Sequence, residues 1–434
     1  MSDLQENISE NFVDIDVMRI KKLLDLIDLE YDTNPDNFKF LENNIEFRKF
    51  VINYLNVEKK PSDPRSKKRI HYMDFFCGGG GLSLGVHTAA KLLGYDAKLL
   101  LAADKDSTAL KLVEHHFSPL VKRACSLEEL IKFDIDPSGE TPSFNFFPEI
   151  LDQQISQFKG KVDLIVGGPP CQGHSNLNNL TRGNDPRNYL YFLMPAFAIA
   201  LEAKTIIIEN VRSIVHASED VVGVTQRLLE SYGYFVKETV LDASQHGVAQ
   251  TRTRHFLIAS KVSEPLIDEI SKLMRFDELS FDDVNLKLPK SQHYPTIMES
   301  ESALSKENIE RINHLFNSGD FDLHNEMRPD CHKDGHTYPS VYGRLRGDAP
   351  SGTVTTGYTS PGRGRYIHPH LPRMINSREA ARLQSFPDWY FANVDTLNFN
   401  RSNLSKIIGD AVPSLMLMPI IFSLARSFKS ANST

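Results

Sequence analysis

Residues 70–83 read IHYMDFFCGGGGLS, so a short apolar run leads directly into four glycines and the start of a helical pattern. Apolar runs of this length that end at glycine are typical of buried β-strands. Glycines at a strand-to-helix turn let the backbone approach a ligand, and the helix that follows presents free N–H groups. The segment therefore predicts a strand, a turn and a helix. On its own it fits a cofactor site, a nicotinamide enzyme included, or a tight turn without a ligand.

Further apolar runs of strand length follow, separated by stretches with helical spacing. Strands that alternate with helices predict an α/β domain in which a mostly parallel sheet is covered on both faces. Ligands of such sheets bind at the carboxyl ends of the strands, so the polar residues there are the first candidates for a functional site. The expected strands are residues 70–76, 98–103, 162–166, 205–208, 235–241 and 255–259.

The rest of the chain divides by composition. Residues 1–58 show helical spacing, and residues 59–69 form a basic linker that is either a solvated connector or an arm that contacts phosphates. The alternating pattern fills residues 70–260. Residues 261–372 are irregular and rich in Pro, Gly and His, which indicates a second domain or a large insertion. Helical patterning returns in residues 373–434, at 377–385 and 412–428.

Composition sets limits on the class of protein. The 434 residues carry a formal net charge of −7, so binding to nucleic acid would require a local basic surface. Four cysteines without a CxxC pair exclude a disulfide framework, and we expect reduced thiols and a cytoplasmic protein. No apolar run approaches the roughly 20 residues of a membrane span, and no signal peptide is visible.

Two strand ends carry the residues with the clearest chemistry. Asp104 follows the second expected strand, where a carboxylate can bind ribose hydroxyls, so we expect an adenosine-containing cofactor. The third strand runs into GGPPCQGHS at residues 167–175, where two prolines stiffen the backbone before Cys171. A cysteine in this setting, before a polar loop that can close as a lid, is a candidate nucleophile. Cys125, by contrast, is expected to be inert packing.

The next two strands also have polar ends. Glu209 follows four largely apolar residues, so we expect a partly desolvated carboxyl whose raised pKa suits proton donation, unless it is a surface acid. Arg252 and Arg254 alternate where the last strand begins. Alternate strand residues share a face, so the two arginines either bind a phosphate or base oxygen together or form a solvated pair.

Taken together, these residues resemble the cytosine-5 DNA methyltransferase family, whose motifs recur here in order over roughly residues 70–260 and 373–428. The resemblance implies a Rossmann-like methyltransferase domain, a smaller target-recognition domain at residues 261–372, a helical N-terminal extension and S-adenosylmethionine as cofactor. The implied catalytic residues are Cys171, Glu209, Arg252 and Arg254. The implied cofactor-binding residues are Phe76, Gly78, Gly80, Gly81, Asp104, Pro170, Leu190 and Asp410. Residues 378–384, REAARLQ, match a later motif of the family.

Three positions depart from the family pattern. The closing motif usually reads GNAVP, but residues 409–413 read GDAVP, which puts in question the hydrogen bond expected at Asp410. His174 stands where phenylalanine is more frequent. The family's third motif supplies an acid that contacts adenine, and this acid has no clear counterpart, although Asp134 is a candidate.

The resemblance also implies a mechanism and a substrate. Cys171 would attack carbon 6 of a cytosine flipped out of double-stranded DNA, and carbon 5 would then accept the methyl group. Glu209 would hold ring nitrogen 3, while Arg252 and Arg254 would bind the base oxygen and neighbouring backbone. Five arginines stand against one acid between residues 340 and 376, and arginine can read guanine edges. The expected DNA-binding residues are Gln172, Ser175, Arg344, Arg346, Arg363 and Arg365.

The expected setting is a restriction-modification system, with an endonuclease that acts on the same sequence as a functional partner, no membrane and a monomeric enzyme. No metal site is expected at His324, Cys331, His332 and His336, because their spacing lacks a matched ligand pair. Three alternatives stay open. They are a tRNA cytosine-5 methyltransferase, a catalytically silent DNA-binding relative, and a nicotinamide oxidoreductase that would leave the segment around Cys171 without a purpose.

Overall fold

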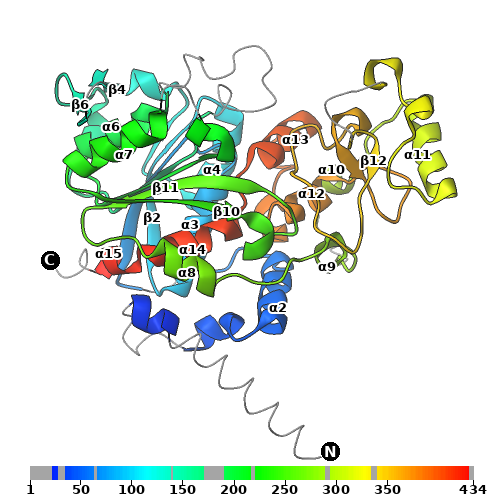
Figure 1. Ribbon diagram of the computed structural model, residues 1–434, viewed down its shortest axis with the longest axis horizontal. Helices are drawn as coiled ribbons and strands as arrows, with labels where there is room; N and C mark the ends of the chain where they lie inside the picture. Colours follow the sequence, from blue (N-terminus) through cyan, green and yellow to red (C-terminus); the bar gives the residue numbers. More distant parts are fainter. Residues whose placement is uncertain are drawn as a thin grey trace, which may run out of the picture.

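A seven-stranded sheet forms the centre of the larger lobe in this computed structural model (Figure 1). The structure describes residues 22–27, 35–62, 66–137, 140–170, 190–216, 220–288, 294–333 and 340–429. The strand order is β10-β11-β9-β8-β1-β2-β3, and only β11 runs antiparallel to its neighbours. The strands are β1 Arg69–Phe75, β2 Asp96–Ala103, β3 Val121–Arg123, β8 Leu164–Gly167, β9 Thr205–Val211, β10 Phe235–Asp242 and β11 Thr253–Ser260. The predicted mostly parallel sheet is therefore confirmed.

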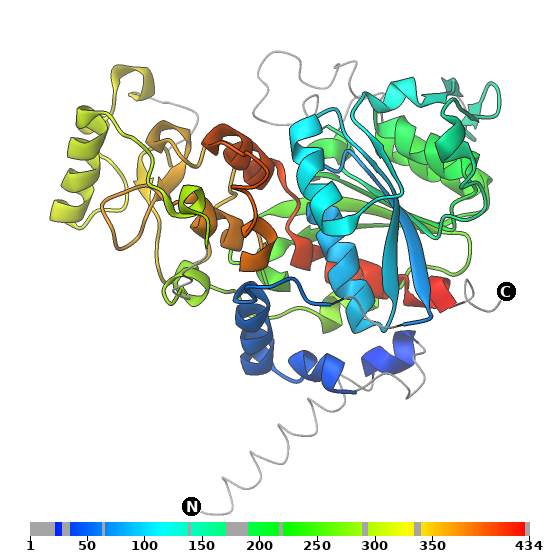
Figure 2. The same cartoon turned by 180° about the vertical axis from the view of Figure 1, so that it is seen from behind.

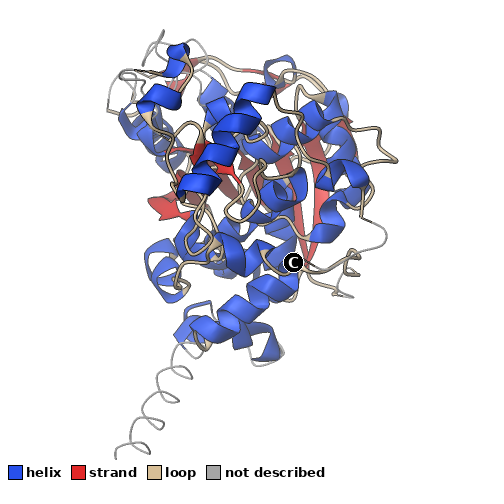
Figure 3. Ribbon diagram, turned by 90° about the vertical axis from the view of Figure 1, so that its right-hand side faces the viewer, coloured by secondary structure: helices blue, strands red, loops and turns tan. Residues whose placement is uncertain are grey.

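Both faces of the sheet are buried, because successive strand residues point to opposite sides. In β9, Ile207 lies in one hydrophobic core, while Ile206 and Ile208 lie in the other. Helices α3 (Gly81–Leu92) and α4 (Ser107–Phe117) contribute to the first core, and α6 (Leu193–Ala200) and α7 (Val221–Ser231) to the second. Viewed from the side, helices and loops enclose the strands (Figure 3). This two-sided cover is what the apolar strand runs predicted.

Some elements were not predicted. Strand β3 has only three residues, two of them charged, so it carries no apolar run. Two small antiparallel ladders follow it. They pair β4 (Ile131–Lys132) with β7 (Glu149–Ile150), and β5 (Ile135–Asp136) with β6 (Ser143–Phe144).

The smaller lobe contains little regular structure and lies beside the sheet domain (Figure 1). Before it, α8 (Ile267–Leu273) still packs on the sheet domain, where the Leu266 amide donates to the Ser423 carbonyl. The chain therefore leaves that domain after α8, although the irregular segment begins near residue 261. The elements of the smaller lobe are α9 (Phe281–Asn285), α10 (Thr296–Glu299), α11 (Lys306–Ser318), β12 (Gly343–Arg344) and β13 (Arg365–Ile367), with short 3-10 turns between them.

The C-terminal return is helical but more broken than expected. The helical character predicted for residues 412–428 is confirmed, but these residues do not form one continuous helix. Pro413 and Pro419 each lack an amide hydrogen, and the chain instead forms a 3-10 turn and two short helices. The elements are α12 (Ser377–Leu383), α13 (Arg401–Asp410), η10 (Ser414–Leu417), α14 (Met418–Ser423) and α15 (Ala425–Lys429). Within the described ranges, residues 401–423 alone are long and apolar enough to cross a membrane, and most of this stretch is buried in the protein.

The described N-terminal residues form part of the folded body. They include a helical turn at residues 22–27, η1 (Pro35–Leu41) and α2 (Asn44–Leu55), and the predicted helical character is confirmed there. Helix α2 lies below the seam between the two lobes (Figures 1 and 2). The Phe47 ring stacks on Phe276 with 3.6 Å between the ring centroids. The guanidinium of Arg382 donates to the Leu55 carbonyl at 3.2 Å and to Oδ1 of Asn56 at 2.7 Å.

Candidate active site

The glycine-rich turn after β1 has a backbone conformation that favours glycine. Phe76, Gly78 and Gly80 have φ values of 54°, 49° and 82°, in the left-handed region that glycine tolerates best. A Cβ atom on Gly81 would lie 2.4 Å from the Val412 carbonyl oxygen, so only glycine fits there. The turn therefore brings the N-terminus of α3 against the segment that follows α13.

Asp104 closes the same turn from β2. Its Oδ2 accepts a hydrogen bond from the Gly78 amide at 2.8 Å, and its Oδ1 accepts one from the Asp106 amide at 2.7 Å. These bonds hold the carboxylate at the ends of two neighbouring parallel strands. Phe76 and Leu190, two further residues of the predicted site, are half-buried. Both pack against the second core. The set offers a fixed carboxylate and apolar surface, which suits a ribose and a flat base.

Asp410 ends α13 and stands where an amide was expected. The Lys406 ammonium lies 2.9 Å from Asp106 and 3.6 Å from Asp410. Burial raises the pKa of Asp410, while Lys406 acts in the opposite direction. A lysine one helical turn earlier therefore offsets the additional negative charge, and it links α13 to the residues around Asp104.

Glu209 and Arg254 form the buried ion pair at the ends of the central strands. The Nε atom of Arg254 lies 2.9 Å from Oε1 of Glu209, and their side chains are 15% and 9% exposed. Their strands β11 and β9 are antiparallel neighbours, with Phe256 opposite Glu209 and Arg254 opposite Val211. The predicted burial of Glu209 is confirmed, and a cation now partners it.

The chain that leads to Cys171 passes directly over this pair. A Cβ atom on Gly168 would lie 3.0 Å from Oε2 of Glu209, and Asn210 Nδ2 donates to the Pro169 carbonyl at 3.3 Å. Pro170 is half-buried at the end of this segment. Cys171, Gln172, His174 and Ser175 lie outside the described residues. The described chain therefore ends beside Glu209, one residue before the predicted nucleophile.

Arg252 has a different environment from Arg254. It lies just before β11 and is 5% exposed, and its Nη1 donates to the Val354 carbonyl at 3.3 Å. We expected both arginines to lie on one face of a strand, but only Arg254 lies in β11. Arg252 instead connects the sheet domain to the chain that returns from the smaller lobe.

Two buried glutamines make a connection that the sequence did not reveal. Gln250 accepts a hydrogen bond from the Val354 amide and donates to Oε1 of Gln384, each at 3.0 Å. Gln384 in turn donates to the Ile408 carbonyl at 2.7 Å. The pair links the smaller lobe, the start of β11 and the last turn of α13, near Asp410.

The family's third motif would supply an acid after the third strand, but the residues directly after β3 include no acid. The Asp104 amide donates to the Arg123 carbonyl, which places the end of β3 next to Asp104. The residues that follow β3 are Ala124, Cys125 and Ser126, and Cys125 is half-buried. Asp134 instead lies in the ladders beyond, bonded to Asn145.

The four predicted DNA-binding arginines of the smaller lobe fall into two pairs. Arg344 stacks between the rings of Phe316 and Phe321, at 4.6 and 4.7 Å from the centroids. Arg365 donates to the Phe321 and Arg344 carbonyls and pairs with Asp322. Arg363 and Arg346 are exposed, and Arg346 pairs with Asp348. The second pair is the more exposed of the two.

The described ranges contain no group of three or more His, Cys, Asp or Glu residues placed to hold a metal ion. His324 pairs with Asp320 at 3.3 Å, and the Cys331 Sγ atom lies 2.9 Å from Nδ1 of His332. These contacts are between neighbours in sequence on exposed surface. His336 lies outside the described residues.

A family profile for the C-5 cytosine-specific DNA methylase matches residues 70–426. The Type II methyltransferase M1.BsuMI of Bacillus subtilis (strain 168) is 36% identical over 375 residues, which are 86% of this chain and 84% of that protein. This chain belongs to the C-5 cytosine-specific DNA methylase family. As the sequence indicated, it is an enzyme, a DNA (cytosine-5)-methyltransferase.

Further relatives agree with this assignment. The methylase is 32% identical over 374 residues to the Type II methylase M.HgiDII of Herpetosiphon aurantiacus, with coverage of 82% and 94% of the two chains. The crystal structure of a putative DNA modification methyltransferase encoded within an E. coli prophage is 24% identical, with a TM-score of 0.53 over 82% of this chain and 98% of that one. The S. pombe Dnmt2 methyltransferase is 16% identical, with a TM-score of 0.54 and the same coverage. These two structures share the fold.

Proposed function

We propose that this methyltransferase moves a methyl group from S-adenosylmethionine to carbon 5 of a cytosine flipped out of a specific duplex sequence, through a covalent adduct with Cys171. One observation supports the proposal most directly. The buried Glu209–Arg254 pair lies against Gly168, three residues before Cys171. An acid held by a cation thus lies against the segment that leads to the candidate nucleophile, and an acid that can protonate the ring favours covalent attack on a pyrimidine.

The residues at the strand ends fit S-adenosylmethionine. The cofactor would supply a methyl group on a positively charged sulfur. Asp104, already held by two backbone amides, can still accept from ribose hydroxyls, and the half-buried Phe76 and Leu190 offer apolar surface for the adenine. Pro170 and the turn at Gly78, Gly80 and Gly81 would complete the site, with Asp410 at its far side.

The chain's own groups account for the steps at the base. The Cys171 thiolate forms a bond to carbon 6, and the electron pair displaced from the 5,6 double bond makes carbon 5 nucleophilic. A protonated Glu209 carboxyl donates a hydrogen bond to ring nitrogen 3 and passes its proton there as negative charge develops, while Arg254 keeps the carboxyl in place. After methyl transfer, a base such as a water molecule removes the carbon 5 proton, and the electron pair of that bond restores the 5,6 double bond and expels Cys171 as a thiolate.

The target atom is inaccessible inside a duplex, so the base must leave the stack. Gln172, Ser175, Arg346 and Arg363 are proposed to contact DNA directly. Arg344 and Arg365 would support that surface, because their guanidinium groups are engaged with Phe316, Phe321 and backbone carbonyls. Similarity to Type II methyltransferases supports a restriction-modification role in the cytoplasm, with an endonuclease of the same specificity and a monomeric methylase.

Transfer of labelled methyl from S-adenosylmethionine to mixed-sequence duplex DNA, with tRNA in parallel, tests the proposal. Label in DNA alone is the expected result. Label in tRNA alone would mean that the substrate is tRNA rather than DNA, with the same chemistry. Label in neither, together with retained DNA binding, would make the chain a binding protein.

A further inference from the structure

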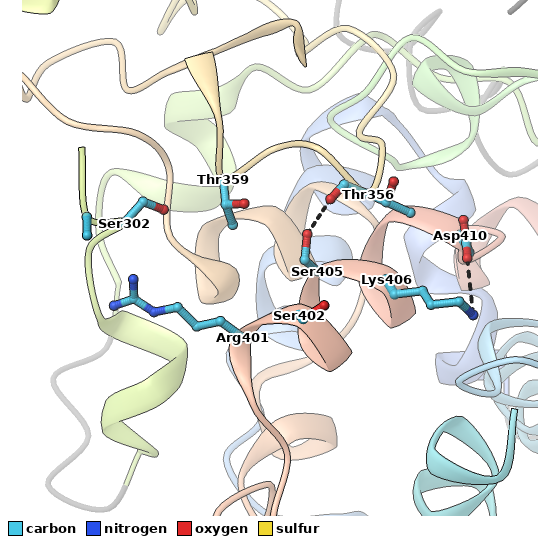
Figure 4. Close-up of a pocket in the computed structure, with 9 residues that line it drawn as sticks. Ser302, Thr356, Thr359, Arg401, Ser402, Ser405, Lys406 and Asp410 are labelled. Atoms are coloured by element: carbon cyan, nitrogen blue, oxygen red, sulfur yellow. Dashed lines mark hydrogen bonds and ion pairs between the residues drawn. The ribbon is translucent and has the colours of Figure 1, made fainter. Parts of the chain in front are cut away.

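A pocket of about 690 Å³ lies between the smaller lobe and one side of α13 (Figure 4). Successive turns of α13 form its floor, and two turns of the smaller lobe form its opposite wall. Of the proposed cofactor-binding residues, Asp410 alone lines it, so the pocket adjoins the site at the strand ends. The lining residues are Ser302, Ala303, Thr356, Thr359, Arg401, Ser402, Ser405, Lys406 and Asp410.

The lining is hydroxyl-rich and carries two cations against one acid. Lys406 is directed toward Asp410 and also pairs with Asp106, so its charge is largely offset. The guanidinium of Arg401 points toward Ser302 in Figure 4, and its Nε donates to Ser300 Oγ at 3.2 Å. Arg401 therefore supplies most of the positive character of the pocket.

The wall from the smaller lobe continues into the exposed arginine Arg363. Thr356 and Thr359 belong to a turn in which the Ser360 amide donates to the Gly357 carbonyl at 2.9 Å. A Cβ atom on Gly357 would lie 2.5 Å from the Cβ of Arg363, so this arginine lies against the same turn. Arg363, an exposed cation already proposed to meet DNA, therefore lies beside the turn that carries Thr356 and Thr359.

Such a lining fits a phosphodiester better than a base. Phosphate oxygens take hydrogen bonds from arginine and from serine and threonine hydroxyls, and these contacts position DNA without reading its sequence. We propose that this pocket holds a backbone phosphate of the substrate DNA, with Arg401 as the charged contact and Ser402 and Thr359 as neutral donors. The proposal rests on the proposed function and adds α13 to the DNA-binding surface.

Salt-dependent binding to a mixed-sequence duplex tests this assignment. We expect Arg401→Gln to weaken binding and to reduce the slope of log affinity against log salt by about 0.9, the value for one lost phosphate contact. Arg401→Lys should restore the slope, because it keeps the charge. Arg426→Gln, at an exposed arginine of α15 on the far side of the sheet domain, is the matched control and should keep the wild-type slope. The affinity for S-adenosylmethionine, measured by calorimetry, should not change in any variant.

Several results would overturn the assignment. An unchanged slope in Arg401→Gln would do so, as would an equal change in Arg426→Gln. If Arg401→Lys were as weak as Arg401→Gln, the role of Arg401 would be its bond to Ser300 rather than its charge. Methyl transfer by the wild-type protein reports separately on the proposed function, so a failure of that function is distinguishable from a failure of the pocket.

Discussion

Nε of Arg254 lies 2.9 Å from Oε1 of Glu209, and neither side chain is more than 15% exposed. Burial of an ion pair costs desolvation energy for both charged groups, and their mutual attraction offsets this cost. Removal of one partner therefore leaves a buried charge that nothing compensates. The two residues come from antiparallel neighbours in the sheet, where the hydrogen-bonded ladder fixes their separation. Their geometry is thus set by the fold before any substrate arrives.

Glu209→Gln should lower the rate of methyl transfer by about 10²-fold or more, because an amide cannot supply the acid function. Single-turnover transfer of labelled methyl measures the effect. Glu238→Gln is the matched control, since Glu238 is a carboxylate of the neighbouring strand β10 that pairs with His255. Nearly normal turnover in Glu209→Gln would remove Glu209 from the mechanism.

Cys171→Ser should abolish methyl transfer and leave the binding of DNA and S-adenosylmethionine largely intact, because a serine hydroxyl is a far weaker nucleophile than a thiolate. Cys125→Ser should retain activity and serves as the control for loss of a thiol. Binding is measured by anisotropy and calorimetry, and transfer by labelled methyl. Substantial turnover by Cys171→Ser would exclude the covalent mechanism.

Asp74 should make stability depend on pH. Burial raises the pKa of this carboxyl to about 7, against a hydrogen bond of 2.6 Å from Ser83 Oγ that acts in the opposite direction. Between about pH 4 and pH 7 the folded protein therefore keeps a proton that the unfolded chain has lost, so this group's contribution to stability falls as pH rises through that window.

Asp74→Asn removes this titration. The free energy of unfolding of the variant, relative to wild type, should increase from pH 5 to pH 7 and change little above that range. Urea unfolding at several pH values measures it, and Asp395→Asn, at an exposed aspartate, is the control. A constant difference across the pH range would show that Asp74 is ionised in the folded protein.

Gln384→Ala should lower the free energy of unfolding by about 1–3 kcal/mol, because Gln250 loses one of its two acceptors and the Ile408 carbonyl loses a side-chain donor. Gln250→Ala should cost a similar amount. The double variant should cost less than the sum, since the two side chains share one bond. Gln226→Ala, on the surface of α7, is the control for loss of an amide. Strict additivity would argue against a coupled pair.

Asp410→Asn restores the amide expected from the family pattern. We expect the dissociation constant of S-adenosylmethionine to change by less than about fivefold, because the Lys406–Asp410 pair is partly exposed and Lys406 keeps its contact with Asp106. Calorimetry measures it, with the Asp104→Asn variant as the comparison expected to bind far more weakly. Loss of binding in Asp410→Asn would make the carboxylate itself part of the cofactor site.

The strand-end motifs could be predicted because each follows an apolar run. Motifs that are far apart in sequence come close together because the strand ends lie at one edge of the sheet. Strand β3 could not, since its three residues include Lys122 and Arg123 and depend on pairing with β2. The same applies to contacts over long sequence distances. Gln250 and Gln384 are 134 residues apart, and no local pattern connects them.

The number of arginines in the smaller lobe could be counted from the sequence, but the placement of their side chains could not be predicted. Five arginines in a short segment indicated a DNA-binding surface, yet Arg344 and Arg365 are engaged with aromatic rings and carbonyls. The aliphatic chain and the guanidinium group of an arginine can stabilise a lobe with few regular elements. The sequence alone does not distinguish this structural role from DNA recognition. Arg401, which the basic segment does not include, borders the pocket instead.

The family match begins at residue 70, but the folded body begins earlier. Helix α2 supplies the Leu55 carbonyl and the Asn56 side chain to the buried guanidinium of Arg382, and Phe47 covers Phe276. A chain trimmed to the boundary of the family would leave that guanidinium short of two acceptors and an aromatic face open to water. The region that the family profile matches is therefore smaller than the unit that folds, and variants should be designed on the larger one.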